Sequence, residues 1–120
     1  MKILFCISQL DFADHIALAY LSAIAKTLGH QTFLCILKEK DLVTEVRNLK
    51  PDIVAYSAII QGFEAMVQSH KAALRVHQFV SIMGGPQPTF FPQTFEYSEV
   101  DAYCVGEGEG AFQDFLVKVE

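Results

Sequence analysis

Short apolar runs that alternate with stretches of helical periodicity constrain the fold of this chain more than any other feature. The runs cover residues 2–8, 31–37, 52–57, 77–83 and 102–105. The first is hydrophobic without interruption from Ile3 to Ile7, which is typical of a strand that is covered on both faces. Apolar residues at helical spacing follow each of the first three runs and resume near Gly108. Strands alternating with helices predict an α/β domain.

The order of these elements predicts a particular sheet. Right-handed crossovers give a parallel sheet with helices on both faces, and five such strands predict the flavodoxin-like (Rossmann-like) order 2-1-3-4-5. Asp14, or Asp11 if the helix starts earlier, is the expected N-cap of the first helix, and Gly29 is its expected stop. The 120 residues fit one domain, residues 1–120, and the uncapped helix at Glu120 predicts a fragment of a longer chain.

Composition excludes several classes of protein. The net charge is −5 and the nine Lys and Arg residues are scattered singly, which argues against nucleic-acid binding. No apolar run approaches the roughly 20 residues of a membrane helix, and the apolar start is too short for a signal peptide, so we expect a cytoplasmic protein. A hydrophobic content of 52% with 19% charged residues predicts that a ligand, a partner or a neighbouring domain covers some of the surface.

The thiols and imidazoles form no recognisable reactive set, so neither catalytic nor metal-binding residues are predicted. Cys6, Cys35 and Cys104 lie far apart inside apolar runs, without C-x-x-C spacing, and are interpreted as buried free thiols. The four histidines are not at metal-ligand spacing: His15, His30, His70 and His77. The apolar stripe of the third helix places His70 inward, whereas its seven-residue spacing from His77 favours two surface histidines.

Ligands of such sheets bind at the carboxyl ends of the strands. The candidate contacts there are Ser8 and Gln9 after the first strand, Ser57 and Ile59 after the third, Gly84, Gly85 and Pro86 after the fourth, and Gly106, Glu107 and Gly108 after the fifth, with Asp11, Gln61 and Glu109 beside them. Four of the seven glycines lie in this set. Amide donors, hydroxyls and bare backbone favour an uncharged, extended polar ligand over a polyphosphate. Glu107 and Glu109 also fit simple charge compensation at a helix N-terminus.

The segment after the fourth strand, Gly84-Gly85-Pro86-Gln87-Pro88, defines its own backbone. Paired glycines remove two Cβ atoms, so a flat or bulky group can lie directly on the main chain. The prolines keep the chain extended and exclude a helix until about Thr94. The alternative interpretation is a tight turn between strand and helix that contacts no ligand.

Other ligands of this fold class require features that the sequence lacks. A dinucleotide fingerprint needs glycines in the first strand-to-helix turn, and residues 8–13 contain none. A flavin phosphate loop would need several Ser, Thr and Gly residues there, and only Ser8 is present. A phospho-acceptor receiver domain needs Asp at the end of the third strand and a basic residue at the end of the fifth, where this chain has Ser57 and Gly106.

Two motifs resemble a known family. Residues 84–89 read Gly-Gly-Pro-Gln-Pro-Thr, and residues 100–109 read Val-Asp-Ala-Tyr-Cys-Val-Gly-Glu-Gly-Glu. Together they are similar to the N-terminal cobalamin-binding domain of class B radical SAM enzymes, of the magnesium-protoporphyrin ester cyclase and methyltransferase type. Such enzymes carry a C-terminal catalytic domain with a C-x-x-x-C-x-x-C iron–sulfur cluster site that uses S-adenosylmethionine. That domain is absent from these 120 residues.

The resemblance implies a role for each matching residue. Ser57 would meet the buried nucleotide tail of cobalamin, with Ile59 at the third position of the same S-x-T/L motif. Gly84 and Gly85 would let the tail lie against the sheet edge, and the segment 106–109 would border the cleft. The D-x-H-x-x-G motif of methionine synthase-type carriers is missing, since residues 11–17 read Asp-Phe-Ala-Asp-His-Ile-Ala. A "His-off" corrinoid is therefore implied, with His15 as a loop or helix-start residue and Gln87 where many relatives have His.

Two functions of different classes follow. The first is a non-catalytic module that holds cobalamin for methyl transfer or related radical chemistry by a catalytic domain elsewhere in the parent enzyme. The second is a flavodoxin-like interaction or regulatory domain without a ligand, whose partner surface would lie near Phe90, Phe91 and Phe95.

Overall fold

The computed structural model describes residues 1–8, 12–57, 63–84, 99–103 and 109–119. Its elements are β1 (Lys2–Ile7), α1 (Phe12–Thr27), β2 (Gln31–Ile36), α2 (Leu42–Leu49), β3 (Ile53–Ser57), α3 (Phe63–Val76), β4 (Val80–Gly84), β5 (Ala102–Tyr103) and α6 (Glu109–Val119). The strands pair in parallel in the order β2-β1-β3-β4-β5. The predicted flavodoxin-like sheet is confirmed.

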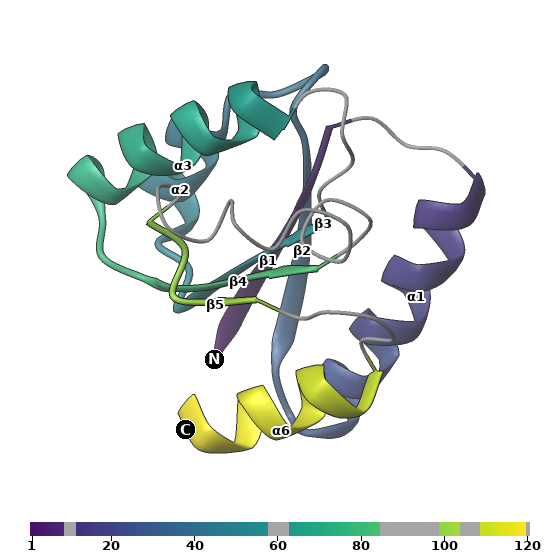
Figure 1. Cartoon of the computed structure of the whole chain (residues 1–120). Helices are drawn as coiled ribbons and strands as arrows, with labels where there is room; N and C mark the ends of the chain where they lie inside the picture. Colours follow the sequence, from purple (N-terminus) through teal and green to yellow (C-terminus); the bar gives the residue numbers. More distant parts are fainter. Residues whose placement is uncertain (9–11, 58–62, 85–98, 104–108, 120) are drawn as a thin grey trace.

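The sheet separates two hydrophobic cores (Figure 1). Helices α2 and α3 pack on one face, where residues such as Leu4, Val54 and Met66 are buried. Helices α1 and α6 pack on the other, over residues such as Ile3 and Ile53. Because successive side chains of a strand point to opposite faces, β1 contributes alternately to both cores. This two-sided burial explains why its sequence is an unbroken apolar run.

Local capping fixes the helix α2. Its N-cap Asp41 accepts hydrogen bonds from the backbone N–H and the hydroxyl of Thr44, at 3.2 and 2.9 Å. Its C-cap Lys50 has a left-handed backbone with φ 51°, and its N–H donates to the carbonyl of Val46. Pro51 follows and cannot continue the helix.

The boundaries of other elements differ from the predictions by a few residues. Helix α1 begins at Phe12, so Asp14 lies in its first turn and is not its N-cap, while the alternative cap Asp11 lies outside the described residues. The expected stop is confirmed at Gly29, which has φ +91° just beyond the helix. The segment that the prolines were expected to keep extended, up to about Thr94, lies outside the described residues. Within the described residues, no helix has the length and apolarity that crossing a membrane requires.

Candidate functional site

The carboxyl ends of the three central strands bring two predicted site residues into one row. Ile7 of β1 pairs with Ser57 of β3, and Ser57 pairs with Gly84 of β4. Ser57 is half-buried, and Gly84, the last residue of its strand, has no side chain to cover its neighbour. The register of a parallel sheet therefore places a hydroxyl beside accessible backbone, as predicted from the strand ends.

The alternation of side chains assigns this row to the face that α1 and α6 cover. Tyr56 belongs to the core under α2 and α3, so Ser57 points to the opposite face, on the same side as Ala55. The row below it, two residues back along the strands, contains Phe5 of β1, whose ring lies 5.7 Å from that of Phe112 of α6. The Ser57 hydroxyl and the Gly84 backbone thus lie directly above an apolar aromatic layer.

Ser8 lies at the same edge, but the period of the strand places it on the other face, with Cys6. Its carbonyl accepts a hydrogen bond from the N–H of Lys38 at 3.2 Å, just beyond the last pair of the β1–β2 ladder. The Oγ of Ser8 is buried and has no hydrogen-bond partner among the described residues. A buried hydroxyl without a partner is unfavourable, and a polar ligand group at this edge would satisfy it.

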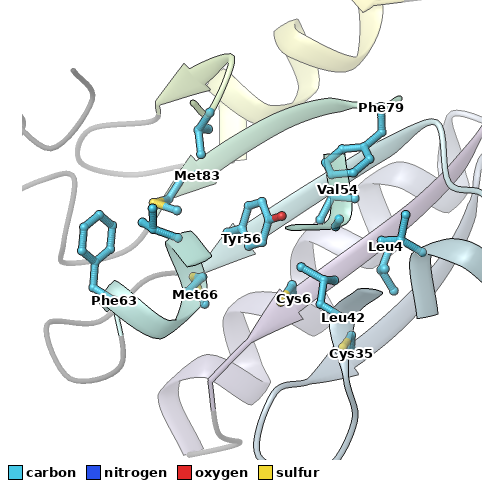
Figure 2. Close-up of a cluster of buried hydrophobic side chains, with 14 residues drawn as sticks. Leu4, Cys6, Cys35, Leu42, Val54, Tyr56, Phe63, Met66, Phe79 and Met83 are labelled. Atoms are coloured by element: carbon cyan, nitrogen blue, oxygen red, sulfur yellow. The ribbon is translucent and has the colours of Figure 1, made fainter. Parts of the chain in front are cut away.

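A buried polar chain supports the end of β3, and sequence reasoning missed it. The hydroxyl of Tyr56 lies 2.7 Å from Nδ1 of His70, and Nε2 of His70 lies 3.1 Å from the carbonyl oxygen of Glu99. Since a carbonyl only accepts, Nε2 carries the proton and Nδ1 accepts from the tyrosine. Tyr56 lies in the middle of the cluster that Figure 2 shows, and His70 is fully buried. The chain ties three segments together, because its members come from β3, α3 and the residues before β5.

His70 corrects one of the two interpretations made from the sequence. The inward placement on α3 is confirmed, and the pairing with His77 on a helix surface is wrong. Helix α3 ends at Val76, and Nε2 of His77 bonds the carbonyl of Pro51 at 2.9 Å. A tyrosine inside an apolar run was the available signal, since a buried phenol requires a partner.

Burial governs the ionisation of this chain. Desolvation lowers the pKa of His70 below its ordinary value, against the opposing effects of the Glu99 carbonyl and the carboxylates of Asp101 and Glu99. Desolvation likewise raises the pKa of Tyr56 well above its ordinary value. At neutral pH both groups are therefore uncharged, and the chain consists of neutral hydrogen bonds.

Asp101, part of the second sequence motif, has a structural role. Its carboxylate accepts from the N–H of Ser81 at 2.8 Å and from the Ser81 hydroxyl at 3.1 Å, while its own N–H donates to that hydroxyl at 3.0 Å. Ser81 is fully buried in β4. These three bonds attach the start of β5 to β4 and so position the strand end that precedes residues 106–109.

The remaining predicted contacts lie outside the described residues: Gln9, Ile59, Gly85, Pro86, Gly106, Glu107 and Gly108. The same holds for Cys104, Asp11, Gln61 and Gln87. His15 falls within α1 and Glu109 is the first residue of α6. Cys6 and Cys35 are buried free thiols, as predicted. Where the structure describes the chain, no three His, Cys, Asp or Glu side chains converge to form a metal site.

Solved structures share this fold at low sequence identity. A cobalamin-binding protein from Desulfitobacterium hafniense DCB-2 matches with a TM-score of 0.67 and 15% identity over 99% of this chain, which spans 58% of that protein. The response regulator domain of CheB from Thermotoga maritima matches with a TM-score of 0.67 and 12% identity, over 99% of this chain and 93% of that domain. A putative pilus assembly protein, cpaE, from Burkholderia thailandensis E264 gives 0.69 and 15%, over 99% and 97%.

These structural likenesses establish the fold, and a comparison with protein-family models identifies the family. No curated protein sequence matches the chain significantly. The model of the B12 binding domain family matches residues 10–116, which is most of the chain. That match includes Ser57 and Gly84 at the strand ends, where the row above the aromatic layer was found. The chain therefore belongs to the B12 binding domain family and has a cobalamin-binding domain fold.

Proposed function

We propose that this domain binds cobalamin along the carboxyl edge of its sheet, with Ser57 and Gly84 against the nucleotide tail. The row that sets the Ser57 hydroxyl beside the side-chain-free end of β4 is the observation that carries the proposal. An amide-rich ligand with an aromatic end needs a hydrogen-bonding group, accessible backbone and an apolar floor. Ser57 and Gly84 supply the first two properties on one face of the sheet, and the buried Phe5–Phe112 pair lies in the next row of that face.

The unsatisfied Oγ of Ser8 fits the same ligand. Its burial at the edge requires a partner that the described protein residues do not provide. The predicted contacts Gln9, Ile59, Gly85, Pro86, Gly106, Glu107 and Gly108 belong to the connections that follow these strands, and the proposal assigns them to the rest of the cofactor surface. Bound cobalamin supplies the cobalt-centred chemistry, and the domain supplies orientation and exclusion of water.

We further propose that cobalt has no histidine ligand from this chain. Three of the four histidines are bonded elsewhere: His30 to the amino group of Met1 at 3.0 Å, His70 to Tyr56, and His77 to the Pro51 carbonyl. Met1 and Pro51 precede β1 and β3, at the amino edge of the sheet opposite the proposed site. The fourth, His15, lacks the glycine that the D-x-H-x-x-G pattern requires.

The resemblance of residues 84–89 and 100–109 supports a parent enzyme of the class B radical SAM type. In this proposal a C-terminal catalytic domain of a cytoplasmic enzyme would hold the iron–sulfur cluster and S-adenosylmethionine. The present domain would position the corrinoid for methyl transfer or related radical chemistry by that catalytic domain. Sequencing the parent gene beyond the codon for Glu120 tests it directly. Three cysteines in C-x-x-x-C-x-x-C spacing are expected, and a parent that lacks them contradicts this part of the proposal alone.

Binding is tested by titrating the chain with hydroxocobalamin and following the visible spectrum, with dialysis to confirm retention. Ser57→Ala removes one neutral hydrogen bond, about 0.5–1.5 kcal/mol, and should weaken the Kd about 2- to 13-fold. Gly84→Val adds a branched side chain on the ligand face of a strand that tolerates such residues, and should weaken binding more strongly. Ser22→Ala is the matched control, because Ser22 bonds Thr32 at 2.9 Å beside the edge strand β2.

Absence of a spectral change at high hydroxocobalamin, with the domain folded, contradicts the proposal, and so does equal binding by the Gly84→Val variant. The paramagnetic resonance spectrum of bound cob(II)alamin tests the absence of a histidine ligand: it should lack splitting from a protein nitrogen and be unchanged in His15→Ala.

The alternative function, an interaction domain with a surface near Phe90, Phe91 and Phe95, rests on residues outside the described part of the chain. The structural likeness to the CheB response regulator domain does not support phosphoryl transfer to this chain, because β3 ends in Ser57 where a receiver domain needs the acceptor Asp.

A further inference from the structure

Two buried thiols face each other across neighbouring strands. Cys6 of β1 and Cys35 of β2 are direct register partners, and both side chains belong to the core under α2 and α3. Figure 2 shows the pair on this face beside Leu42. Parallel strands lie about 4.8 Å apart, which falls within the Cα separation of about 4.4–6.8 Å that a disulfide bridges. The backbone therefore already has the spacing that an S–S bond needs.

The two thiols differ in their surroundings. The Cys35 thiol lies 4.0 Å from the Lys40 carbonyl, beneath the turn that leads into α2, and the Cys6 thiol is hydrogen-bonded to Cys35. This bond from Cys6 lowers the pKa of Cys35. The Lys40 ammonium also lowers it, whereas the carboxylates of Glu45 and Asp41 raise it. The same interaction, with burial, raises the pKa of Cys6 well above its ordinary value. Cys35 is therefore the better nucleophile of the two.

Access to Cys35 runs through the sheet edge. Both thiols are fully buried, but β2 is an edge strand, and Phe33, two residues before Cys35 on the same face of the strand, is 38% exposed. Residues 38–41 of the covering turn are exposed. Opening of this one turn, which costs far less than global unfolding, would admit a small oxidant to Cys35.

We propose that Cys6 and Cys35 form a redox-active dithiol that a hydroperoxide oxidises to a cross-strand disulfide. The Cys35 thiolate attacks the terminal peroxide oxygen, the O–O bond breaks, and water or an alcohol leaves with the proton that Cys35 released. Cys35 is thereby oxidised by two electrons to a sulfenic acid. The Cys6 sulfur then attacks the Cys35 sulfur, the S–O bond breaks, and the hydroxide leaves as water with the Cys6 proton. The sum is two thiols and one hydroperoxide giving one disulfide, one alcohol or water, and one further water.

The disulfide would form close to the candidate site. Cys6 precedes Ser8 by two residues, and the N–H groups of Leu37 and Lys38 hold the carbonyls of Ile7 and Ser8 at 2.9 and 3.2 Å. A covalent link between the strands would fix this part of the edge. The inference stands on the thiol pair alone and does not depend on cobalamin binding.

Peptide mapping of the reduced chain after hydrogen peroxide tests the proposal. After blocking with N-ethylmaleimide, trypsin separates the three cysteines into the peptides 3–26, 27–38 and 76–118. The expected product is a disulfide between 3–26 and 27–38, with loss of two of the three free thiols, and it should persist in Cys104→Ser. A disulfide that involves 76–118 instead, or no disulfide at peroxide levels that oxidise the urea-unfolded chain, overturns the proposal.

Single variants separate the roles of the two sulfurs. In Cys6→Ser the linked peptide should be lost and Cys35 should be trapped by dimedone as its sulfenic acid. In Cys35→Ser, Cys6 should remain unmodified, and a dimedone adduct on Cys6 would overturn the assignment of Cys35 as the nucleophile. Cys6→Ala serves in place of Cys6→Ser if circular dichroism shows that the buried hydroxyl prevents folding.

Discussion

Replacing Tyr56 by Phe removes one oxygen atom and isolates the Nδ1 of His70. The two groups are 2.7 Å apart, with Tyr56 3% and His70 0% exposed, so water cannot replace the lost donor. An unsatisfied buried acceptor costs about 1–3 kcal/mol. We expect the free energy of unfolding to fall by about 2 kcal/mol, which for a domain of this size corresponds to a Tm lower by about 8 °C.

Urea unfolding followed by far-UV circular dichroism measures this change. The midpoint should shift while the m-value stays constant, since the phenyl ring keeps the same surface buried. Tyr20→Phe is the matched control, because Tyr20 is 57% exposed on α1 and its change should stay within about 0.5 kcal/mol. In a double-mutant cycle with His70→Leu the two losses should be less than additive. A Tyr56→Phe protein as stable as its Tyr20→Phe counterpart would refute the reasoning.

Four further predictions concern stability. The unfolded chain binds a proton that the buried His70 resists, so stability should fall as pH decreases below the unfolded-state pKa of about 6.5, by at most about 1.4 kcal/mol per pH unit. Urea midpoints between pH 5 and 8 measure it, and His70→Leu should reduce the slope. Asp101→Ala leaves the N–H and hydroxyl of buried Ser81 without their acceptor and should cost about 2–3 kcal/mol by urea unfolding, and a loss below 0.5 would contradict the β4–β5 tie. Asp41→Ala removes the α2 cap and should cost about 1 kcal/mol, whereas Asp41→Asn should retain most of it. Lys50 has a left-handed backbone that glycine adopts without strain, so Lys50→Gly should increase the free energy of unfolding by up to about 1 kcal/mol and raise the thermal midpoint. A lower midpoint would show that the Lys50 side chain stabilises the fold by more than its backbone strain destabilises it.

The central strands β1 and β3 were predictable because burial on both faces leaves an apolar run, and the order of the strands followed from right-handed crossovers. The start of α1 was not predictable, since Asp11 and Asp14 are both acceptable caps and the sequence contains no signal that ranks one above the other. The surroundings of His70 were hidden for a different reason. Its partners lie 14 and 29 residues away along the chain, and a helical pattern shows that a residue points inward without showing what it meets.

The candidate site was predictable to the level of strand ends. Parallel register alone aligns Ser57 with Gly84, so the rule that ligands bind at carboxyl ends sufficed to find the pair. The sequence analysis missed that Ser8 and Ser57 point to opposite faces of the sheet. The alternation of side chains predicts this, because Ser8 is two residues after Cys6 and Ser57 is two residues after Ala55, which lie in different cores. The unpaired Ser8 hydroxyl required coordinates, because it depends on which groups surround one atom.

Enclosure of β1 and β3 between two helix layers also limits where this scaffold can change. A new polar group inside either strand would lose its hydration on whichever face it lay. Adaptation to another ligand therefore has to occur in the connections beyond the ends of the strands. Apart from the hydrogen-bonded Tyr56, His70 and Ser81, the interior requires only apolar side chains of suitable volume, which many sequences supply. Replacing the connections at the carboxyl edge of the sheet, while leaving the strands intact, is therefore the rational route to changing the ligand of this domain.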